Sequence, residues 1–235
     1  MLGQPYYLSD WYNYEDQTVG FIKIDLQTGK QVGNASLSGY APSLGTFGMS
    51  GLVYYVATYG LVQNKTCRVA TVDVGNGTII RQSRFFCEDY AEFVFYDDTL
   101  ERLGVGTVRY DSVSPLTIWR VDPVDGAQRG VYATKDFVRI LFYSYEKTSH
   151  TLLLLIEGPS PSVQTILLIT LDRTSATSKS FLVSNNTNWR LGCYDPASRL
   201  VYGLHCTGAA PLQCQLAALD PATNIYKTIG PAREV

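Results

Sequence analysis

The chain alternates apolar and polar positions with a period of two in short stretches, and turn residues separate these stretches. In "KIDLQTGKQVG" and "RVDPVDGAQRG", for example, an apolar run ends at an Asp and a new run follows a turn that contains Gly. Such alternation, in segments rich in Val, Ile, Tyr and Thr, predicts β-strands joined by hairpins. The longest apolar stretches, such as "HTLLLLIEG", predict buried strands, because a membrane-spanning helix needs roughly 20 apolar residues.

An Asp at the end of an apolar run recurs five times along the chain, with spacings of 48, 49, 50 and 48 residues. These anchor residues are Asp25, Asp73, Asp122, Asp172 and Asp220. The residue before each anchor is apolar, and Gly, Ala or Asn stands four residues after it. Asp accepts hydrogen bonds from the backbone of such a turn, and Gly or Asn tolerates the positive φ that a hairpin needs. A steady period over the whole chain is typical of a repeat protein.

Each repeat predicts four short antiparallel strands, lettered a to d in chain order. A second apolar stretch, such as "VYYVA" or "LVYGL", lies 18 or 19 residues before the anchor and predicts strand b. Asp97 and Asp195 stand 25 residues before their anchors, at a predicted turn between strands a and b. Four-stranded units repeated radially are the blades of a β-propeller. The sequence therefore predicts an all-β fold, a five-bladed β-propeller with four-stranded antiparallel blades, as a single domain over residues 1–235.

The first repeat begins at "GQPYYL" and has no strand a of its own. We expect the C-terminal segment Gly230–Val235 to supply this strand, so that the N- and C-terminal segments together close the first blade. One alternative is that the chain is a piece of a larger propeller. A β-sandwich is a second alternative, although it has no reason to keep a constant period. Helical repeats are a third, which the alternation and the Tyr, Val, Thr and Ile content disfavour.

The patterns "CYDPASRLVYGL" and "KIDLQTGK" resemble the repeats of the YVTN and quinoprotein-like propeller families, and the resemblance covers the whole chain. It implies a propeller fold and no particular ligand, because these patterns describe hairpin geometry. The repeat number and length also resemble the five-bladed lectins of the tachylectin type. This second resemblance implies carbohydrate binding, but Trp11, Trp119 and Trp189 do not recur in one register.

Four Asn-x-Ser/Thr sequons fall at predicted turns, loops and outer strands, where an acceptor for a glycan faces solvent. They contain Asn34, Asn64, Asn76 and Asn185. Glycosylation at these positions is expected only in a protein that enters the secretory pathway. The sequons therefore predict a secreted, extracellular glycoprotein.

The cysteines favour the same compartment, because two pairs fall opposite each other across predicted hairpins. We expect disulfides between Cys67 and Cys87 and between Cys206 and Cys214, which form in oxidising surroundings. Cys193 has no predicted partner, and we expect it to be a buried free thiol. The alternative is a cytosolic propeller with five buried thiols.

Composition narrows the range of partners. A net charge of -2 without a run of Lys or Arg predicts no nucleic-acid partner and no attraction to an anionic membrane. Two histidines and the absence of a Cys-x-x-Cys motif predict no metal site and no cofactor. We expect no membrane insertion. A protein or a glycan is the expected partner, with self-association as one form of the protein contact.

No catalytic constellation stands out in the sequence. Most acidic residues fall at predicted turns, and neither histidine has a carboxylate to orient it in a triad. We therefore predict that the chain is not an enzyme and serves as an extracellular structural or protein-interaction module. A lectin is the alternative. A five-bladed glycosidase with carboxylates in its funnel is the second alternative, for which Glu88, Asp89 and Glu92 are the only acidic cluster entering an inner strand.

The predicted binding site is the stretch "SDWYNYEDQ" between strands b and c of the first repeat. We expect a long loop with Trp11, Tyr12 and Tyr14 exposed, because exposed aromatic side chains are frequent anchors of interfaces. The alternative is that Trp11 folds back over the edge of the blade.

Overall fold

The structure is a computed structural model that describes residues 6–13, 15, 18–38, 44–48, 53–59, 66–73, 78–86, 90–108, 116–134, 139–157, 164–172, 175–183, 188–207, 213–223 and 225–234. The chain divides into two compact units. Unit 1 comprises Met1–Arg109 and Thr117–Gly130, and unit 2 comprises Tyr110–Leu116 and Val131–Val235. The prediction of a single domain stays a prediction.

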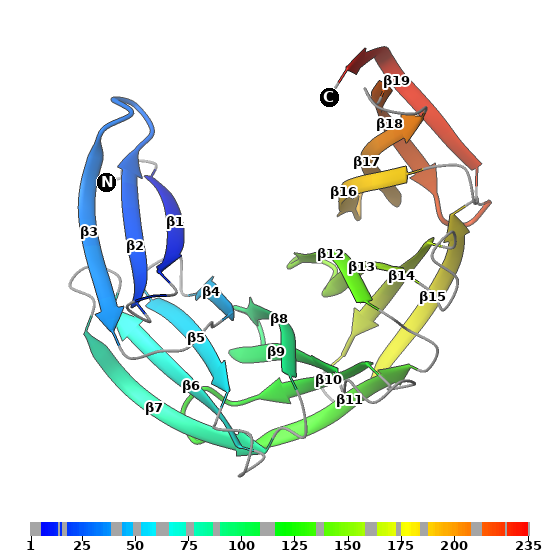
Figure 1. Ribbon diagram of the computed structural model, residues 1–235. Helices are drawn as coiled ribbons and strands as arrows, with labels where there is room; N and C mark the ends of the chain where they lie inside the picture. Colours follow the sequence, from blue (N-terminus) through cyan, green and yellow to red (C-terminus); the bar gives the residue numbers. More distant parts are fainter. Residues whose placement is uncertain are drawn as a thin grey trace. The chain divides into compact units, whose positions relative to one another are not determined.

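The strands of the first three sheets follow one another in chain order, and nearly all of their residues belong to unit 1 (Figure 1). The first sheet contains β1 (Tyr6–Asn13), β2 (Thr18–Asp25) and β3 (Gln31–Ser38). The second contains β4 (Leu44–Gly48), β5 (Val53–Tyr59), β6 (Thr66–Asp73) and β7 (Ile79–Phe86). The third contains β8 (Tyr90–Asp97), β9 (Arg102–Val108), β10 (Leu116–Val121) and β11 (Gln128–Thr134).

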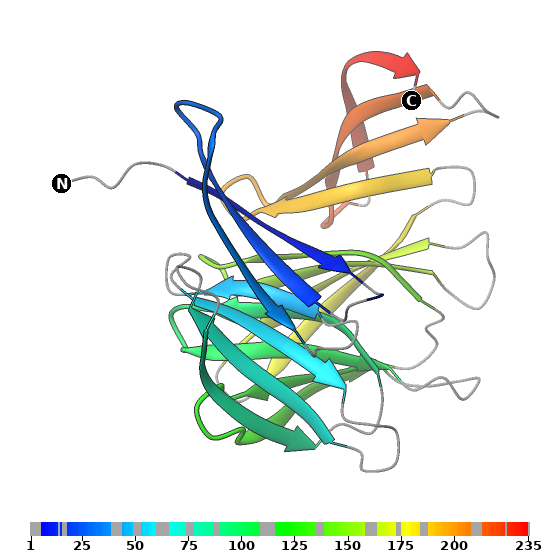
Figure 2. The ribbon, with the colours of Figure 1, turned by 60° about the vertical axis from the view of Figure 1, so that its left-hand side comes forward.

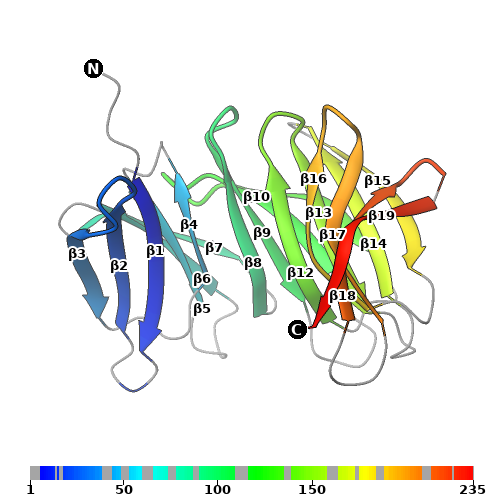
Figure 3. The same cartoon turned by 90° about the horizontal axis from the view of Figure 1, so that it is seen from above.

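Unit 2 holds two further four-stranded sheets (Figure 3). One contains β12 (Arg139–Glu146), β13 (Thr151–Glu157), β14 (Gln164–Leu171) and β15 (Ala176–Val183). The other contains β16 (Asn188–Asp195), β17 (Leu200–Thr207), β18 (Gln213–Asp220) and β19 (Ile225–Glu234).

Each sheet is a meander in which every strand pairs with the next one along the chain (Figure 2). The predicted all-β fold with four-stranded antiparallel sheets is therefore confirmed for four of the sheets. Three strands are described in the first sheet. The strand assignment follows the repeat: each predicted strand b is found as β1, β5, β9, β13 or β17, and each anchor Asp ends the strand after it or follows that strand directly.

Apolar side chains between neighbouring sheets form a core in each unit. In unit 1, β4 lies beside β8, and the core includes Tyr55, Val69, Val94 and Leu103. In unit 2, β12 lies beside β16. The core there includes residues of β13 and β14 on one side and of β17 and β18 on the other, namely Leu153, Leu155, Ile166, Leu168, Val201, Ala217 and Leu219. Six consecutive residues of β13 are buried, as the apolar run predicts.

The end of the chain differs from the prediction. β19 pairs with β18 on both sides of a bulge, over Ile225–Ile229 and at Arg233 and Glu234, and Glu234 lies opposite Gln213. Residues 230–234 are therefore the end of an outer strand, and the expectation that Gly230–Val235 supplies a strand of the first sheet is wrong for these residues. A bulge lets the strand continue, because Gly230 has a φ of 76° and the side-chain amide of Gln215 donates a hydrogen bond to its carbonyl oxygen.

Aromatic rings of unit 1 cover glycines on the neighbouring strand. Phe95 lies opposite Gly104, and Phe93 lies opposite Gly106. A Cβ atom on Gly104 would lie 2.0 Å from Cζ of Phe95, and one on Gly106 would lie 2.2 Å from the ring of Phe93. A phenyl ring therefore fills the space that a side chain on the opposite strand would need, which stabilises the cross-strand pair.

Gly104→Ala should lower the free energy of unfolding by about 1–3 kcal/mol, because the added methyl group forces Phe95 from its position in a packed core. Gly130→Ala is the control, since Gly130 is exposed and the atom nearest to its new Cβ would be Cζ3 of Trp119, 3.3 Å away. Urea denaturation of the two variants measures the difference. Equal stability of Gly104→Ala and the wild type would show that the ring does not depend on this glycine.

Candidate functional site

The turns between strands c and d share one hydrogen-bond pattern. Asp25 Oδ1 accepts bonds from the backbone N–H of Gln27 (2.7 Å) and Thr28 (3.1 Å). Asp122 Oδ1 accepts one from Val124 N–H at 2.8 Å, and Asp220 Oδ1 accepts one from Ala222 N–H at 2.8 Å. Each bond satisfies a turn N–H that no neighbouring strand reaches. The anchor Asp therefore fixes the turn, as an Asx turn does.

In the other two repeats part of the c–d turn lies outside the described residues, and a backbone bond of the anchor Asp closes the turn, as one also does at Asp25 and Asp122. Asp73 N–H donates to the carbonyl of Thr78, and Asp172 N–H donates to the carbonyl of Ser175, both at 2.9 Å. All five anchors thus stand at the corner between a c strand and a d strand.

Acidic residues also hold three turns between strands a and b. Asp97 Oδ1 accepts bonds from Thr99 N–H and Leu100 N–H, both at 3.1 Å. Asp195 and Glu146 make the corresponding bonds to the residues two and three positions on. In all three turns the residue four positions after the acid has a positive φ: Glu101 (51°), His150 (52°) and Arg199 (59°). The acid therefore stabilises a turn that places a non-glycine residue in the left-handed region.

The hydrogen bonds also act on the pKa values of these carboxyl groups. Burial favours the protonated form of Glu146, but bonds from Ser149 and Thr148 outweigh it and hold the pKa at about 2. The Ser198 hydroxyl and the Ala197 N–H lower the pKa of Asp195. These carboxylates are consequently ionised at neutral pH and committed to their turns.

In the third sheet two arginines join the turns to each other. Arg120 Nη1 lies 3.4 Å from Oδ2 of Asp97, and both side chains are buried, with 5% and 1% of their surface exposed. Arg102 Nη2 lies 3.0 Å from Oδ2 of Asp122. The a–b turn and the c–d turn of this sheet are therefore held at a fixed separation by two ion pairs.

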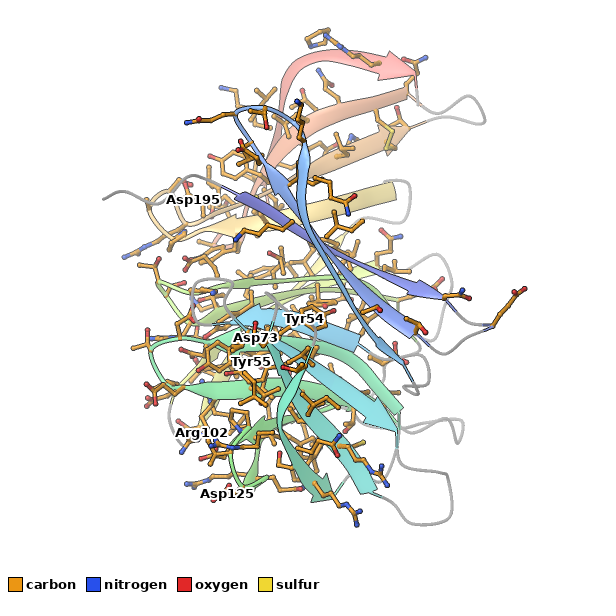
Figure 4. All side chains as sticks on the ribbon, turned by 90° about the vertical axis from the view of Figure 1, so that its left-hand side faces the viewer. Tyr54, Tyr55, Asp73, Arg102, Asp125 and Asp195 are labelled. Atoms are coloured by element: carbon orange, nitrogen blue, oxygen red, sulfur yellow. A yellow bond between two sulfur atoms is a disulfide. The ribbon has the colours of Figure 1, made fainter. Side chains whose placement is uncertain are left out.

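Unit 1 has a groove of about 220 Å³ between its second and third sheets, which we name the first groove. Strand residues of the second sheet and turn residues of the third line it: Val53, Tyr55, Thr71, Ile80, Arg81, Tyr96, Glu101, Arg102, Pro123 and Val124. At its floor the rings of Tyr55 and Tyr96 stack with centroids 4.7 Å apart. Burial, with the hydrogen bond between the two hydroxyls, raises the pKa of Tyr55. Figure 4 labels Tyr55 and Arg102 of this groove.

Unit 2 has a groove of about 470 Å³ at the corresponding place, the second groove. It lies between the sheet β12–β15 and the turns of the sheet β16–β19, and it is lined by Thr151, Leu168, Thr170, Thr177, Ser178, Lys179, Tyr194, Ser198, Arg199, Leu200, Asp220, Pro221 and Ala222. Hydroxyl groups and two cationic side chains dominate this lining.

The two grooves occupy equivalent positions in the repeat. Tyr96 and Tyr194, Pro123 and Pro221, and Arg81 and Lys179 are each 98 residues apart, two repeats along the chain. At other equivalent positions the chemistry differs, since Glu101 corresponds to Arg199. The turn scaffold is therefore kept while the side chains that face the grooves vary.

The predicted binding aromatics are only partly described. Trp11 and Tyr12 belong to strand β1, opposite Gly20 and Val19, so the expected loop from Ser9 is wrong in its extent and β1 continues to Asn13. The pairing with β2 explains this, because alternating residues extend the hairpin. Tyr14 lies outside the described residues. Binding by these three residues stays a prediction.

The sequons stay predictions as well. Asn34 lies on strand β3, the outer strand of its sheet as expected. The other three asparagines lie outside the described residues: Asn64, Asn76 and Asn185.

The cysteine predictions have three outcomes. A disulfide joins Cys206 and Cys214, which lie opposite each other on β17 and β18, and this prediction is confirmed. Cys67 is also disulfide-bonded, while its predicted partner Cys87 lies outside the described residues. Cys193 is a free thiol, but it is exposed, so the expectation of burial is wrong. Cys193 stands on β16, the first strand of the last sheet. The next residue, Tyr194, packs against the core, and neighbouring side chains of a strand point to opposite faces.

Among the described residues, no group of three or more His, Cys, Asp and Glu side chains is arranged to hold a metal ion. In the same part of the chain, no helix has the length and apolar character to cross a membrane.

The grooves themselves were not predicted. Lys179, Arg199, Ile80 and Val124 stand in stretches whose pattern indicates only strands and turns. Aligning the repeats at an offset of 98 residues would bring the equivalent positions together, but it would not show that they line a groove.

No protein-family model matches the chain, and no curated protein matches it. Solved structures do match it. Hydrazine synthase from Kuenenia stuttgartiensis has 12% sequence identity and a TM-score of 0.61, over 90% of this chain and 60% of that chain. TolB from Acinetobacter baumannii has 12% identity and a TM-score of 0.58, over 98% of this chain and 55% of that chain. Oligogalacturonate lyase from Vibrio parahaemolyticus has 10% identity and a TM-score of 0.58, over 94% of this chain and 65% of that chain.

The prediction that the chain is not an enzyme is overturned by this comparison. Two of the similar structures, hydrazine synthase and oligogalacturonate lyase, are enzymes by name. Acidic residues committed to turns do not exclude catalysis, because a fold carries its chemistry in sites that vary from protein to protein. This chain spans less than two thirds of the length of each of these proteins. The likeness at 10% to 12% identity shows the fold alone, and that fold is of the β-propeller type.

Proposed function

We propose that the chain is an extracellular protein-interaction module that binds an apolar side chain of a partner protein in the first groove. The observation that carries the proposal is the exposure of two large apolar side chains in one cavity. Ile80 and Val124 are 57% and 55% exposed, and both line the first groove. Exposed apolar side chains that gather in a hollow favour a protein contact, whereas scattered ones do not.

The rim of the first groove has the polar character of an interface. Arg81, Glu101 and Arg102 line it beside the two apolar residues. Interfaces commonly surround an apolar centre with charged and polar groups, and arginine is frequent among them. The charges of this rim suit a partner segment with polar groups on both sides of an apolar anchor.

The groove is also held rigidly, which favours binding because less freedom is lost in the complex. Val124 stands in the turn that Asp122 fixes, and Arg102 ties this Asp to the a–b turn. Gly126 of the same turn has a φ of 79°, and a Cβ atom there would lie 2.1 Å from the carbonyl oxygen of Arg84 on β7. The turn therefore packs directly against the strand that carries Ile80.

The extracellular setting and the blade number are part of the proposal. The disulfide between Cys206 and Cys214, the bonded state of Cys67 and the four sequons support an oxidising compartment. The five anchors at a period of 48 to 50 residues support five blades.

Ile80→Ser and Val124→Ser should each weaken binding of the partner about tenfold or more, because each removes an apolar contact from the groove. Short random peptides displayed on phage can be selected against the full chain, and the affinity of the best peptide can be measured for each variant. Leu26→Ser is the matched control, since Leu26 is 58% exposed and lines neither groove. Equal affinity of all three variants and the wild type would exclude the first groove as the binding site.

The secretory route has its own test. After expression in the secretory pathway of eukaryotic cells, digestion with an N-glycosidase should lower the apparent mass of the protein. Changing the asparagine of all four sequons to Gln should abolish that shift. A secreted chain without glycans would contradict the predicted glycosylation, and a chain found only inside the cell would contradict the extracellular assignment.

A further inference from the structure

The second groove contains two cationic side chains that have no ionic partner among the described residues. Lys179 stands on the outer strand β15, and Arg199 stands in the turn between β16 and β17. Within the part of the chain that the structure describes, neither side chain has an ion pair or a hydrogen bond. The positive φ of Arg199 is set by the Asp195 turn, so its place at the groove follows from the turn geometry.

The carboxylates near these cations are occupied by their own turns. Asp220, the only acidic residue that lines the described groove, accepts bonds from Ala222 N–H (2.8 Å) and Thr223 Oγ1 (3.0 Å). Asp195 does not line it, and it accepts bonds from Ala197 N–H and the Ser198 hydroxyl. The lining thus carries two positive charges against one negative charge whose oxygens already have donors.

The rest of the lining offers hydroxyl groups and one aromatic ring. Thr170, Thr177, Ser178 and Ser198 are exposed at the groove. Tyr194 is half-buried there, with an apolar ring face that suits a pyranose ring. Hydroxyls both donate and accept hydrogen bonds, so they match the hydroxyls of a sugar without requiring one fixed orientation.

The first groove lacks this combination although it has the same place in the repeat. Glu101 replaces Arg199, and apolar Ile80 and Val124 supply much of its exposed lining. Arg102, the residue after Glu101, is paired with Asp122. Among the described residues the first groove therefore has one unpaired cation, Arg81, whereas the second groove has two beside several hydroxyls.

We propose that the second groove binds an acidic saccharide. Its carboxylate lies between Lys179 and Arg199, which bind it by charge-assisted hydrogen bonds. The sugar hydroxyls face Thr170 and Thr177, which lie opposite each other on β14 and β15, and a ring face packs on Tyr194. This site is separate from the first groove and does not depend on the function proposed for it. An acidic peptide fits less well, because the exposed hydroxyls of Thr170 and Thr177 match the hydroxyls of a sugar.

The test is calorimetric binding of the full chain to a tetrasaccharide that contains glucuronic acid. The matched ligand is the same tetrasaccharide with its carboxylates reduced to alcohols. The acidic form should bind about tenfold more tightly or better, and its affinity should fall with added salt. Lys179→Gln and Arg199→Gln should each weaken the acidic form about tenfold and leave the reduced form unchanged, because only the carboxylate contact is lost.

Lys227→Gln is the control variant, since Lys227 is the exposed lysine of β19 at the position equivalent to Lys179 and lines neither groove. It should bind like the wild type. Absence of binding, equal binding of both ligands, or an equal loss in all three variants would overturn the proposal. Tighter binding of a peptide of alternating Asp and Gly than of the tetrasaccharide would also overturn it and assign the groove to acidic peptides.

Discussion

The structure depends on one interaction, the hydrogen bonding of an acidic side chain to the backbone of its own turn. It recurs at the c–d turns through Asp25, Asp122 and Asp220 and at the a–b turns through Asp97 and Asp195. A turn of three or four residues leaves N–H groups that no strand can reach, and the carboxylate satisfies them. Where the same turn recurs, strands of similar length follow it, and the sheets present these turns at equivalent positions of the repeat.

This constraint separates the scaffold from the surface it presents. Carboxylates and Pro residues stabilise the turns. The neighbouring turn residues can therefore differ from repeat to repeat without a change in the backbone conformation. Glu101 and Arg199 show this most clearly, since both have a left-handed backbone at the same place and carry opposite charges into their grooves. One groove is consequently apolar with a charged rim, and the other is hydroxyl-rich and cationic. A repeat protein can diversify its recognition surface in this way.

The sequence was sufficient to predict the strands, the turns and the order of the sheets, because periodicity and turn chemistry are local properties. It also predicted the Cys206–Cys214 disulfide, since a hairpin fixes which residues lie opposite each other. The course of Gly230–Glu234 was not predictable, because it depends on a bulge opposite Gln215. The stretch that contains the glycines of β9 was predicted as a strand, but the role of these glycines under Phe93 and Phe95 was not predictable, because it requires the cross-strand register. The grooves depend on contacts between sheets, which no local pattern contains.

Urea denaturation of a corner variant tests most directly whether the acidic residues hold the structure. Asp97→Ala removes both turn hydrogen bonds and leaves Arg120 buried without its carboxylate, so the free energy of unfolding should fall by about 3–5 kcal/mol. The double variant Asp97→Ala/Arg120→Met should regain part of the lost stability, because the buried arginine charge is then also removed. Asp195→Ala should cost less, since Ala218 stands where Arg120 stands in the third sheet. Wild-type stability of Asp97→Ala, or equal losses at the two corners, would contradict the account.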